Sequence, residues 1–120
     1  MPADCRKKPT SQIWLVGYNF DMEKHTPHCK LSIVKKLIAE DRVRATASAY
    51  VDASALGITT LSGMCAVVLE LESKDFYKSM TTYADHRVWQ DVYRTRTAAG
   101  DVYLKLAVVD DVLIVSFKEL

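Results

Sequence analysis

The feature that most constrains this chain is a change of pattern near residue 76. Before it, apolar residues recur at three- and four-residue intervals, the spacing of one helix face. The clearest such set is Leu31, Val34, Leu37 and Ile38. After it, β-branched and aromatic residues dominate, and turn residues recur at 84–85, 99–101 and 110–111. Helices followed by a four-stranded antiparallel meander predict an α+β domain whose helices cover one sheet face and leave the other open.

Three helices are expected before the meander. The first should begin at Thr26-Pro27, a hydroxyl N-cap followed by proline at the first helical position, and run to about residue 40. A short strand is expected over 42–46. The second helix should span 47–56 and end at Gly57, where a left-handed C-cap is wanted. The third should span 62–71; it is apolar nearly all round, so a buried strand is the alternative there.

The length of the chain limits the number of domains, and its charge limits the kinds of partner it can bind. A chain of 120 residues with 4 Gly and 3 Pro fits one compact domain. We expect residues 1–21 to form an N-terminal extension and residues 22–120 the domain, because dense patterning starts after Met22. With 16 basic against 15 acidic residues, any basic site must be local. The 3 cysteines form no CxxC pair and no even disulfide framework, which favours a cytoplasmic protein.

The last hairpin predicts its own register. A two-residue loop at 110–111 pairs residues whose numbers sum to 221. One face then carries apolar pairs and must meet the helices. These pairs are Leu104 with Phe117, Leu106 with Val115, and Val108 with Leu113. The opposite face carries Tyr103 against Lys118 and Lys105 against Ser116.

A tyrosine and a lysine side by side on an open sheet face are a donor-rich pair suited to a phosphate. Taken alone, such a pair is more often an ordinary exposed sheet surface. The two preceding strands add further polar residues, which are a weak hint of function. They are Lys78, Gln90, Arg94 and Arg96.

Other chemistries have little support. His25, His28 and Cys29 resemble metal-ligand spacing, but they lack a fourth partner, and an exposed helix start is the favoured interpretation. No nucleophile-elbow motif supports a hydrolase triad with His86. No GxxxxGK or GxGxxG loop is present, so a nucleotide cofactor is not expected.

Long segments of the chain resemble one family. The segments are Lys24-x-Thr26-Pro27-His28, Gly63-Met64-Cys65, the run from Asp75 to His86 (DFYKSMTTYxDH), the run from Trp89 to Arg94 (WQDVYR), and the run from Asp111 to Glu119 (DVLIVSFKE). From Met22 onward the chain resembles the MqsR family of bacterial type II toxins, which are ribonucleases of the RelE-like fold. Thr95 stands where the family pattern has proline.

The resemblance implies a cytoplasmic mRNA endonuclease that inhibits translation and growth. It implies a catalytic set of Lys78, Gln90, Tyr103 and Lys118. Candidate substrate-binding residues around them are Tyr77, Met80, Arg94, Arg96 and Lys105. It also implies a cognate antitoxin, a zinc-binding helix-turn-helix protein through which operator DNA is contacted only indirectly. The alternative is a non-catalytic RNA- or operator-binding module that acts as corepressor with the antitoxin.

Cleavage by attack of the neighbouring 2'-OH needs a base, an acid and positive charge on the phosphate. None of these needs requires a metal or a cofactor, so none is expected. A lysine base must have a lowered pKa, because an ordinary lysine is almost fully protonated at neutral pH. Lys78 or Lys118 is expected as base or charge clamp, Tyr103 as acid or orienting donor, and Gln90 as a phosphate or base positioner.

Overall fold

A computed structural model describes residues 22–82 and 87–120. The expected extension 1–21 and the expected turn at 84–85 lie outside the described residues. Within them, one six-stranded sheet has the order β1-β3-β4-β5-β6-β2. Its strands are β1 (Glu23–Lys24), β2 (Val43–Ala45), β3 (Phe76–Met80), β4 (Gln90–Thr97), β5 (Gly100–Val109) and β6 (Asp111–Glu119). Neighbours are antiparallel except β2, which runs parallel to β6.

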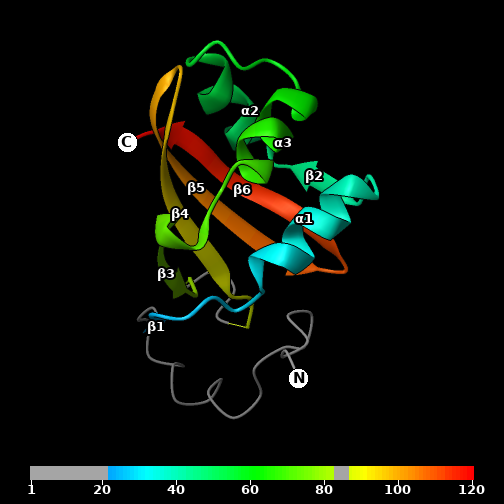
Figure 1. Ribbon diagram of the computed structural model, residues 1–120, viewed down its shortest axis with the longest axis vertical. Coiled ribbons are helices and arrows are strands. Elements are labelled where there is room, and N and C mark those ends of the chain that lie inside the picture. Colours follow the sequence, from blue (N-terminus) through cyan, green and yellow to red (C-terminus); the bar gives the residue numbers. More distant parts are fainter. Residues whose placement is uncertain (1–21, 83–86) are drawn as a thin grey trace.

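Three helices cover one face of this sheet (Figure 1). They are α1 (Leu31–Ala39), α2 (Ala47–Ser54) and α3 (Leu61–Leu69), and a 3-10 turn η2 (Ser73–Asp75) leads into β3. The predicted α+β class, with helices on one face, is therefore confirmed.

Threonine hydroxyls begin two of the helices. Thr46 Oγ1 accepts the Ala49 N–H at 3.0 Å, and Thr60 Oγ1 accepts the Gly63 N–H at 3.0 Å. The N-cap of α3 is thus Thr60, and α3 spans Leu61–Leu69 rather than the expected 62–71. The expected left-handed glycine after α2 is confirmed at Gly57, with φ +83°.

The start of α1 is where the sequence prediction was wrong. The helix begins at Leu31, four residues after the Pro27 that was expected to open it. The segment between them is held as a loop by Asp91 of β4, a carboxylate that is only 4% exposed. Its two oxygens accept the N–H groups of His28 and Cys29, each at 2.9 Å. In a helix that began at Pro27, these N–H groups would point along the helix axis. Here they point to Asp91 of the sheet instead, so the helix begins later.

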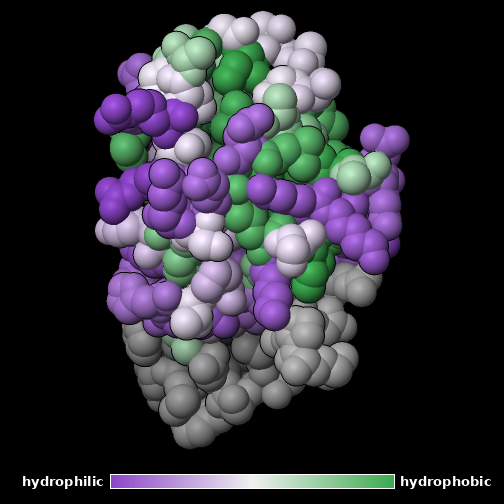
Figure 2. All heavy atoms as spheres, viewed as in Figure 1, coloured by the Kyte–Doolittle hydropathy of each residue, from purple (hydrophilic) through white to green (hydrophobic). Residues whose placement is uncertain are grey.

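The core lies between the helices and the sheet. Phe117, Leu104 and Ile114 from the last two strands are fully buried there, together with Val34 of α1 and Met64 of α3. Figure 2 shows the helix-bearing face, where hydrophobic residues surface among hydrophilic ones. None of the described helices is long and apolar enough to span a membrane.

The predicted register of the last hairpin is correct for only half its length. Tyr103 pairs with Lys118 and Lys105 with Ser116, as expected. Beyond these pairs the register shifts by one, so Leu106 faces Ile114 and not Val115. The remaining pairs are Ala107 with Leu113, Val108 with Val112, and Val109 with Asp111. The predicted pairing of Val108 with Leu113 is therefore also wrong.

The physical reason for the shift is the turn and one bulge. Asp110 alone separates the paired residues Val109 and Asp111, and it adopts φ +69°, a conformation that aspartate tolerates better than most residues. This turn is one residue shorter than expected, and the extra residue, Val115, is absorbed as a β-bulge. Leu113 and Val115 thereby leave the core-facing side of β6.

Candidate active site on the open sheet face

The sheet face opposite the helices carries the predicted catalytic residues in adjacent rows across the strands. In one row, Arg94 of β4 pairs with Tyr103 of β5, which pairs with Lys118 of β6. In the next row, Lys78 of β3 pairs with Val92, which pairs with Lys105. Same-face rows are two residues apart, roughly 7 Å along the strands. Three of the four predicted catalytic residues, Lys78, Tyr103 and Lys118, therefore converge on one patch.

A second bulge enlarges this patch. Phe76 pairs with Tyr93 and Lys78 with the adjacent Val92, so Tyr77 is the extra residue of β3. Bulges re-aim side chains in this way and are frequent beside active sites. Tyr77 is 43% exposed, and the Arg94 guanidinium lies 3.8 Å from its ring centroid. Predicted supporting residues Tyr77 and Arg94 thus lie against each other beside Lys78.

Glu23, which the sequence analysis did not single out, is bound to Lys78. The Lys78 ammonium donates to the Glu23 carboxylate, which reaches it from the edge strand β1. This hydrogen bond raises the pKa of Lys78 and lowers the pKa of Glu23. The lowered pKa that a lysine base requires is therefore not found at Lys78, because the Glu23 carboxylate favours the charged form of this lysine. Glu23 directly follows Met22, and nothing in the sequence there indicated this contact.

Tyr103 sits in the middle of the patch with cations around its ring. The Lys118 and Lys105 ammonium groups lie 5.4 and 5.8 Å from the ring centroid. Burial raises the pKa of the Tyr103 phenol, partly offset by the positive charges of Lys78 and Arg94. The phenol is therefore a protonated donor at neutral pH.

The remaining predicted residues lie farther from Tyr103. Gln90 pairs with Met80 one row beyond Lys78, on the side away from Tyr103. Met80 is only 9% exposed. Arg96 lies one row beyond Arg94 in the opposite direction and binds the carboxylate of Asp101 at 3.3 Å. Thr95, found in place of the family's proline, simply continues β4 and pairs with Val102.

The His-Cys segment before α1 contacts the edge of the sheet. The His28 ring stacks on Trp89 with centroids 5.8 Å apart, and its Nδ1 lies 3.0 Å from the Lys24 ammonium. Burial lowers the pKa of Lys24, while the Asp91 carboxylate raises it. In the part of the chain that the structure describes, no three His, Cys, Asp or Glu side chains gather as metal ligands.

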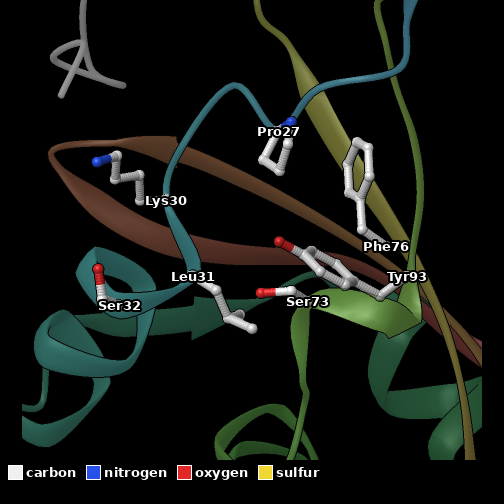
Figure 3. Close-up of a pocket in the computed structure, with 7 residues that line it drawn as sticks. All are labelled: Pro27, Lys30, Leu31, Ser32, Ser73, Phe76 and Tyr93. Carbon is white, nitrogen blue, oxygen red and sulfur yellow. The ribbon is translucent and has the colours of Figure 1, made fainter.

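A separate hollow of about 420 Å³ lies on the helix side of the sheet (Figure 3). Pro27, Phe76 and Tyr93 line it together with Lys30 and Ser73. The Tyr93 hydroxyl is buried and has no hydrogen-bond partner among the described residues, and burial raises its pKa. None of the nine predicted site residues lines this hollow, so it is distinct from the open-face patch.

Comparison with known proteins shows the family of this chain. A family model described as "Motility quorum-sensing regulator, toxin of MqsA" matches residues 26–119. The chain belongs to the MqsR toxin family. A curated relative, the mRNA interferase toxin MqsR of Escherichia coli strain K12, is 59% identical over 98 residues, which is 82% of this chain and 99% of the relative. The α+β fold is the arrangement that the sequence resemblance implies for RelE-like toxins.

Proposed function

We propose that this protein is the toxin of a type II toxin–antitoxin system, a sequence-selective mRNA endoribonuclease that needs no metal. The convergence of Lys78, Tyr103 and Lys118 on one open patch carries this proposal. An open, donor-rich sheet face accommodates an extended single strand, and the near-neutral overall charge leaves RNA affinity to this patch. The name of the Escherichia coli relative, an mRNA interferase, supports the same activity.

The residues of the patch supply the elements of 2'-OH attack on the scissile phosphate. Lys78, held protonated by Glu23, acts as a cationic clamp on the phosphate rather than as the base. Tyr103 is the proton donor to the departing 5'-oxygen, because burial favours its neutral form. Lys118, paired directly with Tyr103, is then the candidate base of the predicted set. Arg94 adds charge from the other side of Tyr103.

The proposed partner is a cognate antitoxin, which the family description names as MqsA. We expect a zinc-binding helix-turn-helix protein that contacts operator DNA itself, so that the toxin meets DNA only through it. The site of action is the cytoplasm, where the mRNA substrate is found.

The purified protein should cleave single-stranded mRNA in excess EDTA and leave a 5'-hydroxyl and a cyclic phosphate. Tyr103→Ala and Lys118→Ala should each slow cleavage by about 100-fold or more, the range of general acid-base and electrostatic groups. The free energy of unfolding should stay within about 0.5 kcal/mol of wild type for the exposed Lys118→Ala, and it should fall somewhat more for the half-buried Tyr103→Ala. End mapping, initial rates and urea denaturation measure these outcomes, with Lys74→Ala on η2 as the control.

Loss of cleavage on chelation would contradict the metal-free chemistry. Wild-type rates in folded Tyr103→Ala and Lys118→Ala would contradict the assignment of the site. Tight RNA binding by the wild type without any new RNA ends would favour the non-catalytic corepressor instead.

A further inference from the structure

A third row of the open face continues across the sheet beyond the catalytic patch. Asp91 pairs with Leu106, so the preceding residue of β4, Gln90, lies beside Ala107 of β5. Ala107 pairs with Leu113 of β6, and Leu113 pairs with Arg44 of β2. The row continues from Gln90 to Met80 of β3; in its other direction, apolar Ala107 and Leu113 lie between the polar side chains of Gln90 and Arg44.

A pocket of about 270 Å³ opens over this row. Its middle is hollow because the central residue is alanine, flanked by larger apolar side chains. The pocket is lined by Arg44, Val88, Gln90, Ala107, Val109, Asp111, Leu113 and Val115. Leu113 and Val115 reach it only because the Val115 bulge turns both toward the open face. The register shift in β6 thus builds apolar walls on a face that otherwise carries polar and charged residues.

The two ends of the pocket offer different chemistry. The Gln90 Oε1 atom is buried and has no hydrogen-bond partner among the described residues. A buried acceptor without a donor costs free energy until a ligand supplies one. At the other end, Arg44 is exposed and makes no ion pair within residues 22–82 and 87–120. Its guanidinium is suited to a phosphate or to the face of an aromatic ring.

We propose that this pocket binds one nucleobase of the RNA next to the scissile phosphate, with Gln90 accepting from an exocyclic amine and Arg44 holding the adjoining backbone. The inference rests on the proposed ribonuclease function and assigns part of its sequence selectivity. Proteins bind single-stranded bases in pockets that are mostly apolar, with a few polar groups that hydrogen-bond to the edge of the base. This pocket is mostly apolar and has the side-chain amide of Gln90 at one end. Adenine, cytosine and guanine carry the required amine and uracil does not.

The position of the pocket fits this role. Its row lies one row, roughly 7 Å, from Lys78 and two rows, roughly 14 Å, from Tyr103. One RNA strand that crosses these neighbouring rows therefore reaches both the phosphate clamp Lys78 and the pocket. Gln90 is on this interpretation a specificity residue that holds the base, which is the second of the two roles expected for it.

The binding test uses short 2'-O-methylated oligonucleotides of A, C, G or U, which 2'-OH attack cannot cleave. In the full-length protein, the Gln90 side-chain amide and the backbone signals of Ala107 and Leu113 should shift in NMR spectra on titration. The A, C and G oligonucleotides should bind about tenfold more tightly than U, which corresponds to one hydrogen bond to a buried acceptor. Ala107→Leu, which fills the pocket, should remove this difference, and Arg44→Ala should weaken all four. Lys74→Ala should change neither.

The outcomes separate the pocket from the nuclease. Shifts confined to Lys78, Tyr103 and Lys118, or an unchanged preference over U in folded Ala107→Leu, would overturn the proposal. If Ala107→Leu does not fold, the wild-type shifts and the affinities of Arg44→Ala decide it. A wild type that binds as expected but leaves unmodified RNA uncut would refute the nuclease and retain the pocket.

Discussion

Replacing Asp91 tests whether one buried carboxylate holds the segment between β1 and α1. Its oxygens accept the N–H groups of His28 and Cys29 at 2.9 Å each. Cys29 is 3% exposed, so water does not readily replace the lost acceptor there. Asp91→Ala removes both bonds, whereas Asp91→Asn keeps one oxygen acceptor.

The magnitude follows from the two bonds. A hydrogen bond to a charged group contributes about 1.5 to 3 kcal/mol net. His28 is only half-buried and regains part of its loss from water, so Asp91→Ala should lower the free energy of unfolding by about 3 to 5 kcal/mol. Asp91→Asn should lower it by about 1.5 to 3 kcal/mol, because only one of the two bonds is lost.

Urea denaturation of the two variants measures these losses. Asp101→Ala is the matched control, since that carboxylate is 51% exposed and binds the exposed Arg96. A surface pair of this kind contributes at most about 1 kcal/mol. A loss below about 1 kcal/mol for Asp91→Ala would refute the reasoning, because it would mean that the two backbone donors are satisfied without the carboxylate.

Two further predictions concern the charge of the patch and its support. Because the hydrogen bond that Lys78 donates to Glu23 raises the pKa of Lys78, Glu23→Gln should lower that pKa, so Lys78 loses its proton at a lower pH than in the wild type. The carbon-13 shift of the Lys78 ε-carbon follows this titration, and an equal or higher midpoint in the variant would contradict the pairing. The stability difference between the two proteins should fade in acid as Glu23 is protonated and in strong alkali as Lys78 is deprotonated. Phe117→Ala, fully buried against the helices, should cost about 3 to 5 kcal/mol of stability and lose activity only with the folded fraction, as paired denaturation and cleavage measurements would show.

Much of the fold follows from patterns that are local in the sequence. The helices over 31–39 and 47–54 repeat apolar or alanine positions at helical spacing, and Gly57 marks an end that glycine favours. The alternation in the last two strands restricted the register to parities that leave Lys118 exposed. The pairing of Tyr103 with Lys118 was predicted from a two-residue loop, and it is correct because the Val115 bulge offsets a turn that is one residue shorter.

The departures have long-range or geometric causes. The late start of α1 depends on Asp91, 62 residues after Cys29 in sequence, which no periodicity in the helix reports. The bulge at Val115 depends on the length of the turn at Asp110. The dipeptide Asp-Asp is compatible with more than one turn length, so the sequence did not predict it. The contact of Glu23 with Lys78 needs β1 to lie beside β3, and a two-residue strand leaves no alternation to recognise.

The two-residue length of β1 has a mechanical consequence for the proposed chemistry. Besides its pairing with β3, this strand is tied at one end by the Met22 backbone, which bonds Thr81 twice. An edge segment with so few bonds opens at a far smaller free-energy cost than the central strands do. Each opening would carry Glu23 away from Lys78 and leave the Lys78 ammonium available to bind another anion. An incoming phosphate would therefore compete for Lys78 with the Glu23 carboxylate, whose effective concentration at Lys78 falls as β1 opens. A pulling force or a fusion partner attached before residue 23 would therefore act on the ion pair between Glu23 and Lys78, and so on the charge proposed to bind the phosphate.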